Sequence, residues 1–130
     1  MTGQDGYREL MHCFQTGNLD GIRRLLDDEL VFDNPAPPNA LNTGVRRGPA
    51  EFMRFLSETA ASCEFELHDM STLVGEPDFF VAIGRERYRV KKTGKLVETS
   101  CIHEQRWRNG RLVFLREYYD TLKYKEACDS

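Results

Sequence analysis

Apolar residues near the start of the chain recur every three to four positions. They form two runs, which are Tyr7, Leu10, Met11 and Phe14, and then Leu19, Ile22, Leu25 and Leu26. This spacing places apolar side chains on one face of an α-helix. The pattern therefore predicts two short helices separated by Thr16-Gly17-Asn18. Asn18 is expected to cap the second helix, which should end at Asp27-Asp28.

The next segment changes from a strand pattern to an irregular one. Leu30-Val31-Phe32 predicts a short strand that stops at Asn34-Pro35. Residues 34–48 are rich in proline, asparagine and glycine, so we expect an irregular loop long enough to cover a site. Pro49 suits the first position of a third helix, which carries an apolar stripe of its own.

From Cys63 onward, apolar residues alternate with polar ones. This period of two predicts strands over about residues 64–74, 79–91, 96–108 and 112–120. Turns at Thr93-Gly94 and Arg108-Asn109-Gly110 connect the last three strands. The element order predicts an α+β fold with helices on one face of an antiparallel sheet. We expect a single domain over residues 1–130, with flexible tails at 1–6 and 124–130.

Composition and charge argue against several classes of function, including nucleic-acid binding and membrane spanning. A net charge of −3 gives no basic footprint for nucleic acid, and no window approaches the ~20 apolar residues of a membrane span. The first residues contain no apolar or basic leader, which favours a cytoplasmic protein. The four cysteines form no Cys-x-x-Cys pair, and no two of the three histidines are four positions apart. Neither a metal nor another cofactor is therefore expected.

Three segments resemble a known family. GNLDGIRRLLDDELVFDNP, RGPAEFMRFL and RWRNGRLVFLREYYD are similar to segments of the nuclear transport factor 2-like superfamily, and within it to SnoaL-like and ketosteroid isomerase-like proteins. The resemblance covers about residues 7 to 120. It implies a cystatin-like α+β roll, in which three N-terminal helices close a cone-shaped, curved antiparallel sheet around a pocket. It also implies a homodimer formed through the outer face of the sheet.

The resemblance assigns positions as well. The base of ketosteroid isomerases aligns with Asn34 or, after a one-residue slip, with Asp33, and such a slip reverses which side chain faces inward. Their oxyanion tyrosine aligns with Leu10, one turn after Tyr7, and their protonated aspartate aligns with His103. Two of three catalytic groups are thus replaced, so a plain ketosteroid isomerase is not expected.

Limonene epoxide hydrolases offer a second comparison. Their tryptophan-arginine-aspartate-tyrosine segment resembles residues 115–118, where Glu117 stands for the acidic residue. Their Arg-x-Asp strand motif would lie around residues 87–89, and the aspartate is missing there. The full hydrolytic set of residues is therefore not present.

Strand alternation groups the candidate residues. If His103 faces the pocket, Thr99, Cys101, Gln105 and Trp107 face it too. The opposite face then has an apolar centre with charges around it, which suits a subunit contact.

Turn lengths set the expected pairing between strands. A two-residue turn at Thr93-Gly94 places Glu86 opposite Cys101, and a three-residue turn at 108–110 places Glu117 opposite Cys101. Glu86, Cys101 and Glu117 would then lie side by side on three adjacent strands, and His103 would be the next inward residue after Cys101. Two carboxyl groups within reach of a histidine suit proton transfer. Two alternatives remain: Glu86 faces outward and pairs with the arginines at 85, 87 and 89, and His103 is a hydrogen-bonded core histidine.

These residues predict a general acid/base enzyme without a cofactor. Its substrate would be a small apolar carbonyl or polycyclic metabolite, such as a polyketide or steroid-like compound, and its reaction an isomerisation, cyclisation, dehydration or similar lyase step. The expected catalytic residues are His103, Glu117, Glu86 and Asp33, and the expected substrate-binding residues are Asn34, Tyr88, Cys101, Gln105, Trp107 and Tyr119.

Two other functions stay open, an epoxide hydrolase of the limonene epoxide hydrolase type and a non-catalytic module for ligand binding or dimerisation. The interior should discriminate the enzyme from the module. A dry cone plugged by Trp107, Tyr119 and Phe32 favours the module, and a cavity of several hundred Å3 the enzyme.

Overall fold

The computed structural model describes residues 1–38 and 40–129. Position 39 of the predicted loop and position 130 of the predicted tail lie outside the described residues. The elements along the chain are α1 (Gly3–Thr16), α2 (Leu19–Arg24), β1 (Leu26–Asn34), β2 (Gly44–Arg47), α3 (Pro49–Ser62), β3 (Cys63–Gly75), β4 (Phe79–Val90), β5 (Leu96–Arg108), β6 (Arg111–Tyr119) and α4 (Thr121–Cys128). Within the described part, no helix is long and apolar enough to cross a membrane.

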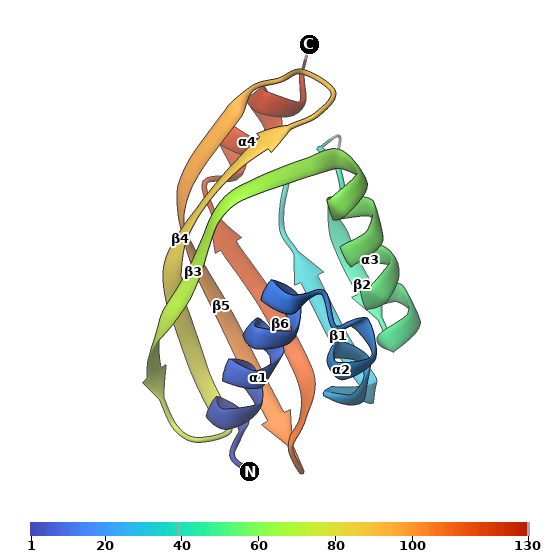
Figure 1. Cartoon of the computed structure of the whole chain (residues 1–130), viewed down its shortest axis with the longest axis vertical. Coiled ribbons are helices and arrows are strands. Elements are labelled where there is room, and N and C mark those ends of the chain that lie inside the picture. The colour runs from blue at the N-terminus through green and yellow to red at the C-terminus, as the bar shows by residue number, and fades with distance from the viewer. Residues whose placement is uncertain (39, 130) are drawn as a thin grey trace.

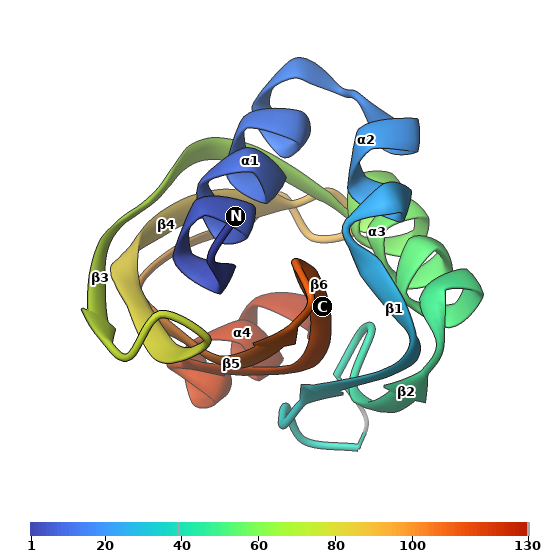
Figure 2. The same ribbon diagram turned by 90° about the horizontal axis from the view of Figure 1, so that it is seen from below.

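All six strands join one curved sheet in the order β2-β1-β6-β5-β4-β3. Figure 2 shows the sheet curving around α1, with α2 and α3 near β1. The predicted α+β architecture is confirmed, but the sheet is mixed rather than purely antiparallel. β1 runs parallel to β6. A parallel pair needs a long connection, and α3 and three long strands lie between these two strands along the chain.

The helix starts follow from local capping. The side chain of Thr2 accepts a hydrogen bond from the Asp5 N–H, and Asp5 bonds back to Thr2, so α1 begins with a capping box. Asn18 caps α2 as predicted, accepting a bond from the Gly21 N–H at 2.9 Å. The predicted end of α2 at Asp27-Asp28 is wrong. The Leu112 N–H binds the Leu25 carbonyl, which draws the chain into β1 after Arg24.

Three further expectations about connecting and terminal segments change. The predicted irregular loop contains β2, which pairs with β1, although Pro49 starts α3 as expected. Residues 3–6 of the predicted N-terminal tail belong to α1. Most of the predicted C-terminal tail belongs to α4, where Asp120 caps the helix and Tyr124, Ala127 and Cys128 are buried. The sheet is therefore covered by four helices, one of them C-terminal.

The turns shift the predicted register by two residues. Val90 bonds to Lys95 across a longer loop than predicted, so Gly84 rather than Glu86 lies opposite Cys101. Asn109 and Gly110 form a two-residue turn with positive φ of 53° and 75°. Glu117 consequently pairs with His103 rather than with Cys101. A shift of two positions leaves every side chain on its predicted face.

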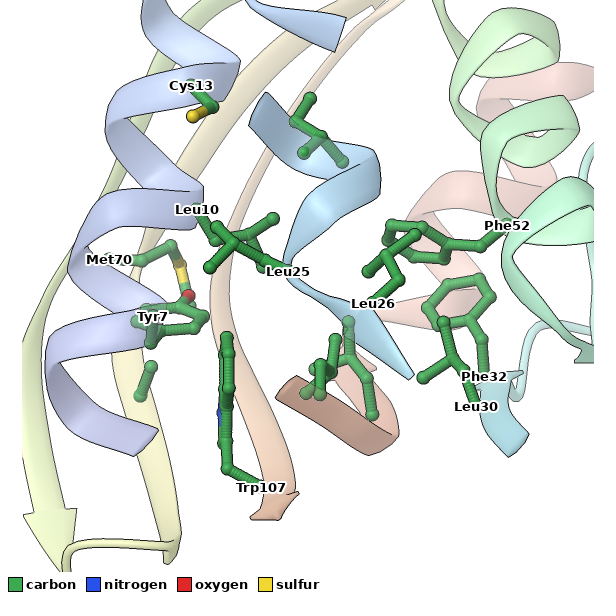
Figure 3. Packing of buried hydrophobic residues seen from close by; sticks show 14 of the residues in the cluster. Tyr7, Leu10, Cys13, Leu25, Leu26, Leu30, Phe32, Phe52, Met70 and Trp107 are labelled. Atoms are coloured by element: carbon green, nitrogen blue, oxygen red, sulfur yellow. The ribbon is translucent and has the colours of Figure 1, made fainter. Parts of the chain in front are cut away.

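The start of α1 and α4 lie at opposite ends of the molecule (Figure 1). Figure 3 shows Trp107 and Met70 near Tyr7 of α1, and Phe32 and Phe52 on the side of α3. A Cβ added at Gly6 would lie 2.5 Å from the Trp107 ring, so α1 and β5 are in direct contact. The Trp107 Nε1 donates to the Gln105 Oε1 at 2.7 Å. This end of the interior, the closed end, is fully packed.

Candidate active site

A cavity of about 530 Å3 lies between the concave face of the sheet and the helices at the end nearer α4. Its apolar wall comes from the end of α1, from α2, α3 and β3, and includes Phe14, Leu19, Ile22, Phe55, Leu56, Phe65 and Leu67. Its polar wall comes mainly from β1, β3, β4, β6 and α4, and includes Asn34, His68, Glu86, Tyr88, Glu117, Tyr119 and Tyr124. The volume matches that of a small-molecule site.

Glu86 faces this cavity. It lies opposite His68 in the β3–β4 ladder, and the His68 Nε2 is 3.3 Å from the Glu86 Oε1. Only 11% of the Glu86 side chain is exposed. The alternative of an outward Glu86 paired with arginines is therefore wrong. The sequence analysis missed His68, although inward alternation on β3 opposite Glu86 was a signal that could have found it.

Glu117 reaches the cavity from β6. Its Oε1 lies 3.9 Å from the His103 Nε2, and its side chain is 18% exposed. Burial, and next the charge of Glu86, raise the pKa of Glu117 to about 8. The carboxyl group therefore holds its proton at neutral pH.

His103 lies behind the cavity rather than in its lining. Its Nδ1 shares a hydrogen bond of 2.9 Å with the hydroxyl of Tyr7 from α1. Burial lowers the pKa of His103 to about 4; the charge of Glu86 opposes this, and His68 adds slightly to it. The ring is therefore neutral. Its buried Nε2 has no hydrogen-bond partner among the described residues.

This placement corrects the expected role of His103 as the principal acid or base, because its ring cannot touch a ligand in the cavity. It also excludes the alternative of a core histidine whose hydrogen bonds are all made, since only one of its two ring nitrogens has a partner among the described residues. Tyr7 is a partner that the sequence analysis did not assign, although Tyr7 stood one turn from the position aligned with the isomerase tyrosine.

Asn34, not Asp33, faces the cavity. The Asn34 Oδ1 accepts a hydrogen bond of 2.5 Å from the Tyr119 hydroxyl, and its Nδ2 donates to the Asn42 carbonyl at 2.7 Å. Asp33 points to the other face of the sheet, where the Arg116 Nε donates to it at 2.9 Å. The expectation of a catalytic Asp33 is wrong because strand alternation turns it away from the cavity.

Tyrosines form the rest of the polar wall. Burial raises the pKa of Tyr88, Tyr119 and Tyr124, so all three keep their phenolic protons. The Tyr119 hydroxyl is engaged by Asn34, and that of Tyr124 donates to the Leu41 carbonyl at 2.8 Å. Tyr88 and Tyr119 thus line the cavity as expected, and Tyr124 is an addition from the unpredicted α4.

Three expected substrate-binding residues lie outside the lining. Gln105 and Trp107 belong to the closed end, where they bond to each other. Cys101 is fully buried on β5, and burial raises the pKa of its thiol, with smaller contributions from Glu86 and Glu117. The β5 residues face inward as predicted, but none of these three belongs to the cavity lining. Toward the closed end, α1 packs directly against β5 at Trp107.

One group of side chains in the described part could hold a metal ion. An oxygen of Glu86, the sulfur of Cys101 and a ring nitrogen of His103 lie within 4.8 Å of one another. Carboxylate, thiolate and imidazole are ligands that zinc accepts. Glu86 is the member of this group that also lines the cavity.

Solved structures with the same fold are numerous. An NTF2-like protein from Burkholderia xenovorans LB400 has a TM-score of 0.90 at 19% identity, covering 99% of this chain and 98% of that one. A protein described as a candidate isomerase from Bacillus subtilis has a TM-score of 0.81 at 23% identity, covering 96% and 91%. TerC, co-crystallised with polyporic acid, has a TM-score of 0.80 at 15% identity, covering 98% of both chains.

No curated protein matches the chain in sequence. The family model of the SnoaL-like domain matches residues 7–115, which is most of the chain. The match contains the first two segments that carried the resemblance and most of the third, and it ends before Glu117, Tyr119 and α4. The structural matches show an NTF2-like fold, and the chain belongs to the family of SnoaL-like domains.

Proposed function

We propose that the protein is a cofactor-independent general acid/base enzyme that acts on a small, largely apolar carbonyl or polycyclic metabolite. One observation carries the proposal: two carboxyl groups, Glu86 and Glu117, face the same cavity from different surroundings. Glu86 lies against His68, whereas Glu117 lies against a neutral imidazole. Carboxyl groups whose surroundings separate their protonation states can act as base and acid in one reaction.

The roles follow from these surroundings. Glu86, which lies beside His68, takes a proton from the carbon next to a carbonyl group. Glu117 has a pKa of about 8, so it donates its proton to the carbonyl oxygen as the enol forms. The free Tyr88 hydroxyl is a second donor for that oxygen. Glu86 then returns a proton to the same or another carbon while the enol hydroxyl returns its proton to Glu117, which completes an exchange or an isomerisation.

His103 and Tyr7 act through Glu117 rather than on the substrate. The Tyr7 hydroxyl holds the imidazole at Nδ1, which leaves the Nε2 directed at the Glu117 carboxyl. A neutral ring there offers no charge that would favour the Glu117 carboxylate, so the group keeps its proton. We assign both as positioning residues.

The neighbours support a small-molecule substrate. Similar structures are described as candidate isomerases, as a candidate SnoaL-like polyketide cyclase, and as TerC co-crystallised with polyporic acid. The cavity also counts against a module plugged by its own side chains, because Trp107 and Phe32 lie outside its lining. An apolar wall of aromatic rings suits a ring-containing skeleton.

We also propose a homodimer through the outer face of the sheet. Ile83, Ile102 and Tyr118 lie side by side on three adjacent strands and are 38%, 36% and 42% exposed. Glu104 and Arg116 pair beside them in the β5–β6 ladder. In a two-fold arrangement a second copy would cover this apolar row and meet each charge with its opposite.

Proton exchange tests the enzyme proposal directly. In D2O, the protein should accelerate exchange of the α-protons of 2-tetralone, a small apolar ketone, as followed by NMR. Glu86→Gln should reduce the rate about 100-fold and Glu117→Gln about tenfold, because one loses the base and the other the acid. Glu64→Gln changes an exposed carboxylate of β3 outside the cavity and is the matched control.

The control should exchange protons at the wild-type rate. Exchange no faster than in buffer, or equal rates in wild type and both cavity variants, would show that these carboxyl groups do not catalyse proton transfer.

A further inference from the structure

Several carboxylates outside the cavity or at its rim pair with arginines, whereas Glu86 and Glu117 do not. Asp33 binds Arg116, Glu58 binds Arg46, and Glu66 at the cavity rim binds Arg87. The described lining of the cavity contains no lysine or arginine at all. The deeper carboxyl groups of the cavity therefore lack a permanent cationic partner.

The floor of the cavity is also short of hydrogen bonds. The Nε2 of His103, which is 95% buried, has no partner among the described residues and lies 3.9 Å from Glu117. Buried polar atoms in native proteins are nearly always paired. His103 itself lies behind the lining, so Glu117, which lines the cavity, is the group that a polar part of a ligand would meet there.

Aromatic rings surround the same region. The rings of Phe65 and Tyr88 are 5.1 Å apart, those of Tyr88 and Tyr124 6.0 Å, and those of Tyr119 and Tyr124 5.8 Å between centroids. Ring faces attract cations, and ammonium groups are commonly bound by aromatic side chains together with a carboxylate. The opposite wall, from Phe14 to Leu56, is apolar.

We propose that the cavity binds amphiphilic cations: molecules with an apolar skeleton and an ammonium group, the ammonium lying between Glu86 and Glu117 and the skeleton against α1, α2 and α3. This rests on the proposed function for the location of the site, and it adds a class of ligand that the site binds. Anionic ligands are rejected, because no basic side chain of the lining can offset their charge.

The protonation of Glu117 predicts the direction in which the affinity for a cation changes with pH. With its pKa at about 8, Glu117 is neutral below that pH, and an ammonium group must displace its proton to form an ion pair. The affinity for a permanently charged ammonium should therefore rise as the pH increases through 8. The titratable groups around Glu117 are Glu86 on β4, Cys101 and His103 on β5, Tyr119 on β6, His68 on β3 and Tyr7 on α1.

Three ligands with one skeleton test the charge preference. They are 4-phenylbutyltrimethylammonium, 4-phenylbutanol and 4-phenylbutanoate, each titrated into the wild-type protein in a calorimeter at pH 7 and pH 9. The ammonium should bind about tenfold more tightly than the alcohol, and the carboxylate most weakly. Its advantage over the alcohol should be larger at pH 9. Because these comparisons use only the wild-type protein, they do not depend on the folding of a variant.

Two variants locate the preference. Glu117→Gln should remove the pH dependence, and Glu86→Gln should reduce the advantage of the ammonium over the alcohol. Glu64→Gln should behave as wild type. An ammonium that binds no more tightly than the alcohol, or does not bind, would overturn the proposal of a cation site. The 2-tetralone experiment would still decide the acid/base function separately, because that ketone carries no charge.

Discussion

The two ends of the interior are built by the same strands but satisfy their polar groups differently. At the closed end, Trp107 and Gln105 bond to each other and α1 packs on them through Gly6. At the cavity end, Glu117 and Tyr88 belong to the cavity wall, and among the described residues neither side chain makes a hydrogen bond comparable to that of Trp107 and Gln105. The contrast indicates that the closed end contributes mainly to stability and the cavity end to binding. Packing at one end stabilises the fold enough for the other end to keep polar groups that reduce stability.

The largest expected effect is at Gly84 of β4, which lies directly against the backbone of Asp69 in β3. A Cβ added at Gly84 would lie 1.7 Å from the Asp69 carbonyl oxygen, which belongs to the backbone and cannot turn aside. Gly84→Ala should therefore reduce the free energy of unfolding by about 4 kcal/mol or more, measured by urea denaturation. Arg85→Ala, at the next position on the outer face, is the control. A Gly84→Ala protein of wild-type stability would disprove this close approach.

A change at the cavity should have the opposite sign. The pKa of Glu117 is about 8 in the folded protein and near 4.5 when unfolded, so the folded state binds the proton more tightly. Its stabilising effect is complete below pH 4.5 and is lost as the pH rises through 8. Glu117→Gln should accordingly raise the free energy of unfolding at pH 9 by on the order of 3 kcal/mol.

The same Glu117→Gln variant should differ little from wild type at pH 4, where the carboxyl group is protonated in both states. Denaturation curves at the two pH values measure the difference. Equal stability of variant and wild type at pH 9 would mean that Glu117 ionises there without penalty.

A smaller effect separates two neighbouring tyrosines. Tyr119→Phe removes the donor to Asn34, which is 97% buried, and should reduce the free energy of unfolding by about 1 to 2 kcal/mol. Tyr118→Phe removes an exposed hydroxyl that binds Glu104 and should change it by less than about 0.5 kcal/mol. Thermal or urea unfolding of both variants gives the comparison. Similar losses in the two would contradict the inward and outward assignment.

The smallest effect on stability, and a large one on assembly, is expected at the outer face. Light scattering at micromolar concentration should show a dimer for the wild type and a monomer for Ile102→Glu, because the substitution places a charge in the apolar row. The monomer should remain folded. A monomeric wild-type protein would exclude the proposed dimer.

The sequence predicted the architecture better than it predicted the site. Alternation along β5 placed Cys101, His103 and Gln105 on the inner face correctly, since facing depends only on parity. It could not show that α1 fills the space above Gln105, because that packing depends on where a helix far away in sequence docks. Register failed for a local reason, since the length of the β4–β5 loop was not evident from its residues.

His68 and Tyr124 show a different limit. Each joins the cavity through an element whose position relative to the others is set by long-range pairing, His68 by the bulged β3–β4 ladder and Tyr124 by the docking of α4. The sequence around a polar residue in such an element does not indicate that the residue will line the cavity. Asn34 and Asp33 were open alternatives for the same reason, and the ladder between β1 and β6 decided between them.

Trp107 gives the molecule a built-in spectroscopic label. It is the chain's one tryptophan, and it lies at the closed end beneath α1. Its emission should therefore report the docking of that helix and stay constant when a ligand enters the other end. Tyrosine absorbance, with Tyr88, Tyr119 and Tyr124 in the cavity wall, should respond in the complementary way. Two wavelengths can thus follow the scaffold and its contents independently, without attaching a dye.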